Sequence, residues 1–247
     1  RYIMPLRSRS EGVFHTATLG VDYKDFQQTV ALIGGGDFNT PISYLPLSLR
    51  YEAMWRASGH STRFGVGSTL SLRGVGNDQQ EFEEKRFLAR NNFMHFNASL
   101  AHTRELPRGF SVEGRIEGQL ADSPLISNEQ FAAGGADSVR GYRESQALGD
   151  DGVYGSVELQ TPSLVREGWK WPDRLIGMAF VDGAKLRVRE ALPGQEDNFV
   201  LSSAGVGLRF TAWSHWDGTL DLAWPFHDSG DIESGEERLH FRVAYEF

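Results

Sequence analysis

The sequence predicts an all-β protein, an antiparallel transmembrane β-barrel, and three observations support this fold class. Apolar and polar residues alternate with a period of two along most of the chain, as in strands with one apolar and one polar side. The alternating segments run for roughly ten to sixteen residues, whereas soluble strands commonly have about five or six. Short and long connections also alternate, which is typical of outer-membrane barrels.

The expected strands follow from this alternation, which is clearest where Leu239, Phe241 and Val243 share one side of the last segment. A partial strand is expected at 2–6. The full strands are expected at 13–23, 42–57, 61–75, 91–106, 110–121, 153–163, 174–188, 199–213, 216–228 and 238–247. Short turns are expected at 58–60, 107–109, 164–173 and 214–215, and long polar connections at 24–41, 76–90, 122–152, 189–198 and 229–237.

The composition argues against several other classes of protein. The net charge of -8 gives no basic face for nucleic acid, so no nucleic-acid partner is expected. The chain has no cysteine and therefore no disulfide or thiolate metal site. It has no run of 18 apolar residues that could form a transmembrane helix. A glycine count of 28 and an aromatic content of 12% suit a β-rich chain with many turns.

The long connection 122–152 contains an unusual motif. Its segment 131–142 reads Phe-Ala-Ala-Gly-Gly-Ala-Asp-Ser-Val-Arg-Gly-Tyr. This resembles the lumen-loop motif of two-partner secretion transporters, the haemolysin-activator family within the BamA/TpsB superfamily. The residues that carry the resemblance are Phe131, Gly134, Gly135, Val139, Arg140, Gly141 and Tyr142. Two later stretches resemble strand motifs of the same family and occur in the same order: 180–183, and 202–210 followed by 220–225. The family more often has Ala-Gly where this chain has Gly183-Ala184.

The resemblance implies a particular place for this chain in a larger barrel. Family barrels have 16 strands, and the motif lies in the loop between the eleventh and twelfth. The chain is then the C-terminal ten to eleven strands, with 1–247 forming one N-terminally incomplete outer-membrane barrel domain. The first five strands and the periplasmic POTRA domains are expected to lie outside it.

The resemblance also implies that the 122–152 loop folds back into the barrel lumen and that Arg140 pairs there with Asp182. A partly desolvated guanidinium needs a carboxylate, and its planar shape suits bidentate pairing. Phe180, Asp182 and Gly183 would form the strand motif on the barrel wall. The alternative is that Asp182 and Gly183 form a hairpin turn.

The implied function is that of an outer-membrane protein translocase, which exports a large β-helical partner protein in two-partner secretion. The alternative is a BamA-like barrel that inserts other outer-membrane proteins, and a barrel hydrolase is a third class. We expect no enzymatic activity, no cofactor and no metal. The expected partners are the secreted exoprotein, outer-membrane lipid or lipopolysaccharide and, during biogenesis, the barrel assembly machinery, which would read Tyr245 and Phe247. We expect a monomer in the Gram-negative outer membrane.

Two other features have unremarkable interpretations. Gly34-Gly35-Gly36 lacks the Gly-Lys-Ser/Thr ending of a phosphate-binding loop and is expected to be an extracellular loop. Glu81, Glu83 and Glu84 form an acidic run for which a solvated loop is expected, with a divalent-ion site as the alternative.

Overall fold

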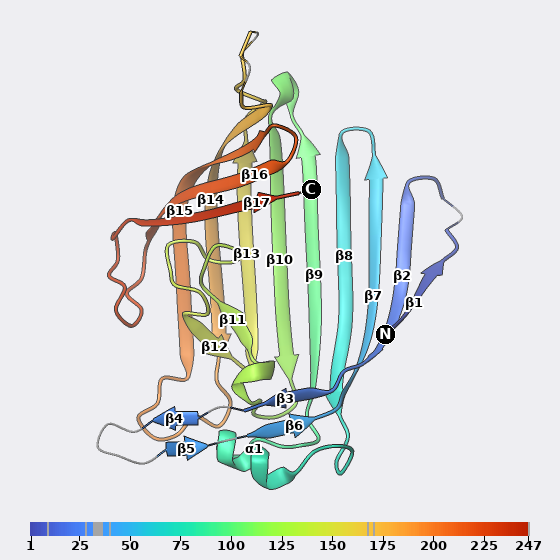
Figure 1. The fold of residues 1–247 in the computed structure, drawn as a ribbon, viewed down its shortest axis with the longest axis vertical. Coiled ribbons are helices and arrows are strands. Elements are labelled where there is room, and N and C mark those ends of the chain that lie inside the picture. Colours follow the sequence, from blue (N-terminus) through green and yellow to red (C-terminus); the bar gives the residue numbers. More distant parts are fainter. Residues whose placement is uncertain are drawn as a thin grey trace.

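The computed structural model describes residues 1–8, 10–27, 29–31, 37–39, 41–166, 168–169 and 171–246. Within these residues, one antiparallel sheet of eleven strands makes up most of the molecule (Figure 1). In chain order its strands are β1 (Tyr2–Leu6), β2 (Val13–Val21), β7 (Pro46–Ala57), β8 (His60–Ser71), β9 (Met94–Glu105), β10 (Ser111–Ala121), β13 (Asp151–Gln160), β14 (Arg174–Arg187), β15 (Asn198–Ala212), β16 (Trp216–Pro225) and β17 (Arg238–Tyr245).

This arrangement confirms the predicted all-β, antiparallel fold class. Every expected strand is present, and each pairs with its neighbours along the chain in an uninterrupted meander. The expected strand at 42–57 is divided, because Leu45 separates β6 (Ile42–Tyr44) from β7. Asp182 and Gly183 lie in the middle of β14, so the alternative of a hairpin turn at these residues is wrong.

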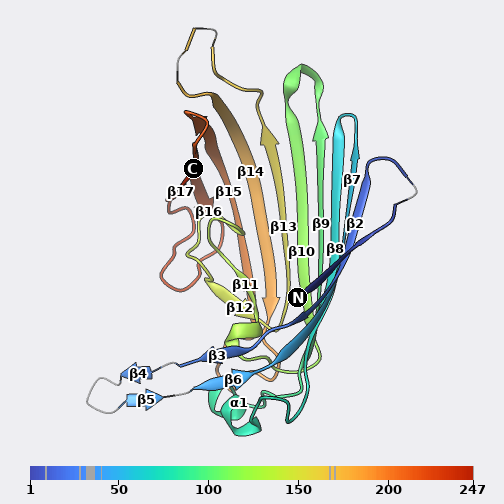
Figure 2. The same cartoon turned by 45° about the vertical axis from the view of Figure 1, so that its right-hand side comes forward.

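The sheet is strongly curved, and its two sides differ in polarity (Figure 2). On β14, Phe180 and Asp182 point to the concave side and are buried, whereas Val181 between them is 56% exposed on the convex side. Val206 on β15 and Leu220 on β16 are similarly exposed, at 50% and 40%. A continuous exposed apolar surface of this kind is costly in water and suits contact with lipid.

The connections differ in length at the two ends of the sheet. Short turns join most of the strands at one end, and long connections gather at the other (Figure 1). The exception is the β13–β14 connection, which lies at the end of the short turns but spans 161–173, so the expectation of a short turn at 164–173 is wrong. The long connections carry the remaining elements, which are β3 (Lys24–Phe26), β4 (Thr29–Ala31), β5 (Asp37–Asn39), β6, α1 (Gln79–Lys85), the 3-10 turn Ser127–Glu129, β11 (Phe131–Ala133) and β12 (Ala147–Gly149); a second 3-10 turn, Pro107–Gly109, lies in a short turn. The expected glycine loop at 34–36 lies outside the described residues. No helix among the described residues is long and apolar enough to cross a membrane.

The acidic run at 81–84 lies in α1 and not in an irregular loop. Asp78 caps this helix by accepting a hydrogen bond from the Gln80 amide, which satisfies a free donor of its first turn. Phe82 points inward from α1 and is 1% exposed. It belongs to a small apolar core that joins the long connections: Ile42, Tyr44, Phe82, Ala89, Phe93, Ala121, Leu125 and Ile126. The long connections therefore form a packed layer over this end of the sheet.

Candidate functional site

The connection from β10 to β13, residues 122–150, turns back into the concave side of the sheet (Figures 1 and 2). Its two limbs pair through β11 and β12, with Phe131 opposite Gly149. Three glycines at its tip, between β11 and β12, have positive φ angles, 106° at Gly134, 105° at Gly135 and 94° at Gly141, a region that glycine enters without steric cost. A Cβ on Gly134 would lie 2.5 Å from the backbone carbonyl oxygen of Arg143. This connection, called the lumen loop below, therefore needs its glycines in order to turn.

The expected ion pair between Arg140 and Asp182 is present and almost fully buried. Arg140 Nε donates to Asp182 Oδ2 at 2.8 Å, and Nη2 donates to Oδ1 at 2.9 Å. The Arg140 backbone amide donates to Oδ2 at 3.2 Å, and the Ser156 hydroxyl donates to Oδ1 at 2.7 Å. The Asp182 carboxylate thus accepts four hydrogen bonds, three of them from one residue of the loop tip.

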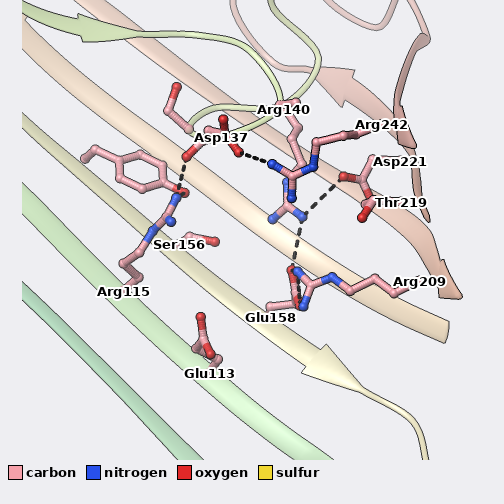
Figure 3. A pocket seen from close by; sticks show the side chains of 13 residues that line it. Glu113, Arg115, Asp137, Arg140, Ser156, Glu158, Arg209, Thr219, Asp221 and Arg242 are labelled. Atoms are coloured by element: carbon pink, nitrogen blue, oxygen red, sulfur yellow. Dashed lines mark hydrogen bonds and ion pairs between the residues drawn. The ribbon is translucent and has the colours of Figure 1, made fainter. Parts of the chain in front are cut away.

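Arg140 also contacts groups that sequence reasoning missed (Figure 3). Its Nη1 donates to Glu158 Oε2 on β13 at 3.1 Å and lies 3.9 Å from Asp221 Oδ2 on β16. Arg209 on β15 donates to the same Glu158 carboxylate at 2.9 Å. The guanidinium carbon of Arg140 lies 3.3 Å from the centre of the Phe180 ring, which adds a cation–π contact. Three carboxylates therefore surround two guanidinium groups.

This cluster borders a polar cavity of about 380 Å³ on the concave side of the sheet. Its walls come from the loop tip and from β10, β13, β15, β16 and β17 (Figure 3). Asp221 Oδ1 is buried without a hydrogen-bond partner among the described residues. The loop tip is therefore held by directional, charged contacts next to open polar space.

Tyr142 and Val139 fix the tip on either side of Arg140. Both are fully buried in an apolar cluster with Tyr154, Leu186 and Leu201. The Tyr142 hydroxyl donates to the His227 carbonyl at 2.9 Å and accepts the His227 amide at 3.2 Å. It also lies 3.1 Å from the Ser202 carbonyl oxygen, so it bonds the backbone where β15 and β16 separate.

The other expected site residues lie in different places. Phe131 packs against this apolar cluster, and a Cβ on Gly152 would meet its ring at 2.3 Å. Gly183 alternates with Asp182 and so faces the convex side, away from the ion pair. Tyr245 lies beside Trp216 at the end of β17, with ring centres 5.1 Å apart and the ring planes tilted by 54°, and Phe247 lies outside the described residues. The structure thus brings Phe131, Val139, Arg140, Tyr142, Phe180 and Asp182 together.

The first limb of the lumen loop is held by Glu129, which is 7% exposed. Its carboxylate accepts hydrogen bonds from Tyr44 at 2.6 Å and Lys24 at 2.5 Å, and it lies 3.3 Å from His95 Nε2. Burial acts to raise the pKa of Glu129, but the hydrogen bonds from His95, Lys24 and Tyr44 outweigh it and lower this pKa. Glu129 is therefore held as a carboxylate by three elements of the sheet and its connections.

Comparisons with known proteins agree with this architecture. Residues 41–210 match the family "Haemolysin secretion/activation protein ShlB/FhaC/HecB". The heme/hemopexin transporter protein HuxB of Haemophilus influenzae is 26% identical over 191 residues, which cover 75% of this chain and 33% of that protein. The outer membrane transporter CdiB of Dickeya dadantii is 27% identical over 161 residues, 64% of this chain and 27% of that protein.

A solved structure shares the fold. CdiB from Escherichia coli superimposes with a TM-score of 0.78 at 19% identity, over 98% of this chain and 44% of that one. The chain spans about a third or less of the length of the curated relatives it matches. The family match covers well over half of the chain, from β6 to β15. The chain therefore belongs to the ShlB/FhaC/HecB family of haemolysin secretion/activation proteins.

Proposed function

We propose that the protein to which this chain belongs is an outer-membrane translocase that exports a large β-helical partner protein in two-partner secretion. Family membership supports this proposal, as does similarity to relatives named as transporters. The observation that carries it is the buried network between the tip of the lumen loop and the wall, centred on Arg140 and Asp182. This network gives the loop one defined position inside the barrel.

The inner face suits the passage of an extended chain. Charged and polar side chains line the cavity beside the loop tip, among them Glu113, Arg115 and Arg242. A wall of mixed charges offers hydrogen bonds that exchange readily with water, so it does not trap a passing segment as an apolar wall would. In this proposal, folding of the partner outside the cell supplies the driving force.

The remaining parts of the proposal concern the whole protein. The chain would be the C-terminal barrel portion, with further strands and POTRA domains preceding it. The barrel would be monomeric, and the assembly machinery would recognise the strand that ends in Tyr245 and Phe247. The convex apolar face would contact outer-membrane lipid and lipopolysaccharide.

The proposal is tested by secretion of the partner exoprotein from cells that carry the full-length transporter with Arg140→Ala. We expect secretion to fall by about tenfold or more, because Asp182 then remains buried without its cation, at a cost of several kcal/mol, and Glu158 keeps only Arg209 of its two arginine partners. The matched control is Arg50→Ala on β7, whose contact with Glu52 at 3.4 Å is between exposed side chains.

The level of assembled barrel, followed by immunoblot, separates the outcomes. Normal barrel level with unchanged secretion would contradict the proposal. Normal secretion together with a loss of other outer-membrane proteins would instead favour the BamA-like alternative.

A further inference from the structure

The C-terminal end of the lumen loop is held by the carboxylate of Asp150, which does not contact the Arg140 network at the tip. Asp150 follows β12 directly and is completely buried, at 0% exposure. Its Oδ1 accepts the Leu125 amide at 2.8 Å and lies 3.2 Å from the Gln130 side-chain amide. Its Oδ2 accepts the Arg189 amide at 2.7 Å. The carboxylate thus joins both limbs of the loop to the connection that follows β14.

The cation that neutralises Asp150 comes from a third connection. Arg86 follows α1, and its two terminal nitrogens donate to the two Asp150 oxygens at 2.5 and 2.7 Å. The same guanidinium donates to the carbonyls of Leu125 at 2.5 Å and Arg189 at 2.8 Å. Four of its N–H bonds therefore end on groups of the lumen loop and of the 188–197 connection, which lie far apart in the sequence.

The burial of this pair makes the three connections depend on one another. A fully buried carboxylate is tolerated only if it is paired and hydrogen-bonded, so Asp150 cannot keep its place if Arg86 leaves. Bidentate geometry also fixes the direction of the guanidinium plane, which a lysine at this position could not do. Since Asp150 immediately precedes β13, its position sets where the returning limb enters the barrel wall.

We propose that Arg86 and Asp150 form a second anchor of the lumen loop, and that Arg86 is a positioning residue for the loop tip. The pair holds the two limbs together where they leave the barrel wall, and the paired strands β11 and β12 lie between this point and Arg140. The tip can then leave its contacts with Asp182 only if the two ends of the loop also shift, or if the pairing of β11 with β12 is lost. This inference rests on the proposed function only for its consequence, the effect on secretion.

The position of the tip can be measured directly. Residues 1–247 contain no cysteine, so Val139→Cys introduces one thiol into this part of the protein, at a fully buried position of the tip, and alkylation is followed on the peptide that contains it. Its rate of alkylation by a small water-soluble maleimide in assembled barrels reports how often the tip leaves its seat. In this background, we expect Arg86→Met to raise the rate by about tenfold or more, a factor equivalent to roughly 1.4 kcal/mol of lost anchoring.

Two further variants test the same anchor if the Arg86→Met barrel does not assemble. Arg86→Lys keeps the charge but loses the bidentate contact, and we expect a rise of about threefold or more. In the double variant Arg86→Met with Asp150→Asn, the uncompensated buried charge is gone, and we expect a smaller rise than in Arg86→Met alone. The control is Arg90→Met, an exposed arginine four residues further along, for which no change is expected.

Measuring both alkylation and secretion of the partner protein distinguishes the second anchor from the proposed role of the loop in secretion. If alkylation rises as expected, Arg86 positions the loop tip, whatever happens to secretion. If alkylation rises and secretion stays normal, the second anchor stands and the proposed role of the seated loop in secretion is wrong. If alkylation is unchanged in the assembled Arg86 variants, the second anchor is wrong, even if secretion falls.

Discussion

The ion pair at the loop tip yields a quantitative prediction for Asp182→Asn. This substitution keeps the shape of the side chain and removes its charge. The side-chain oxygen of the new asparagine can still accept hydrogen bonds from the Ser156 hydroxyl and Arg140 Nη2, which bond to Oδ1 of Asp182 in the unmodified protein. The amide NH₂ then takes the place of Oδ2 and faces two donors, the Arg140 amide and Nε. The variant therefore loses two hydrogen bonds and brings donors into contact with donors.

The size of the effect follows from the burial of both partners. Breaking a buried ion pair by removing one charge costs about 3–5 kcal/mol. Glu158 remains 3.1 Å from Arg140 and still compensates part of its charge, so we take the lower end, about 3 kcal/mol. A change of about 1.4 kcal/mol is a factor of ten, so the seated state of the tip should be disfavoured by roughly a hundredfold.

Hydrogen exchange of the peptide that covers residues 138–142 measures this change in the assembled barrel. The Gly141 amide is the useful reporter, because it donates to His240 Nε2 at 3.0 Å and has no direct bond to Asp182. We expect its exchange to accelerate by roughly a hundredfold in Asp182→Asn. The matched control is Asp217→Asn on β16, whose exposed carboxylate accepts only the Thr211 hydroxyl among the described contacts. Exchange as slow as in the unmodified protein would refute the view that the ion pair seats the tip.

Two further predictions concern the Tyr142 hydroxyl at the tip and Glu129 in the first limb of the loop. Tyr142→Phe removes the hydroxyl that bonds the backbone at two residues, and we expect a loss of about 1–3 kcal/mol in the free energy of unfolding, seen as a lower denaturant midpoint at constant slope. The lowered pKa of Glu129 means that its stabilisation is complete above its usual pKa of 4.5 and is lost as the pH falls through the folded-state pKa. Exchange at 126–131 should therefore accelerate below about pH 4.5, and Glu129→Gln should remove this pH dependence; equal pH profiles for the two proteins would contradict the assignment.

The main sheet could be predicted from the sequence because its strands lie between two different environments. Alternation such as Leu220, Asp221 and Leu222 records apolar contact on one side and polar contact on the other, residue by residue. The pairing of β3 with β6 and that of β11 with β12 could not be predicted in this way, because each has only three residues per strand and lies against other connections. Of these four strands only β6 lies within an expected strand, the one at 42–57. The helix α1 is also too short for a helical period to stand out.

The site could be predicted only in part. The contact of Arg140 with Asp182 was expected from a resemblance, whereas Glu158, Arg209 and Asp221 were not singled out. Alternation places all of these residues on the inner face, but it does not show which of them lie side by side on neighbouring strands. That depends on the register of several strand pairs, for example Glu158 opposite Phe180 and Asp221 opposite Gly207. Register across a sheet is a long-range property, which no local pattern in one strand encodes.

The lumen loop raises the question of why a loop inside a transport barrel is held by buried charges. A well-packed apolar contact of similar volume is often as stabilising as a buried ion pair, or more so. Apolar residues around the tip would, however, also present an adhesive surface to an unfolded chain each time the loop moved. Charged partners such as Arg140 and Asp182 bind strongly only when both are in place, and once separated each is readily hydrated. A loop anchored in this way has one well-defined position while it is seated and leaves little apolar surface behind when it is not, a combination that suits a barrel through which an extended polypeptide must slide.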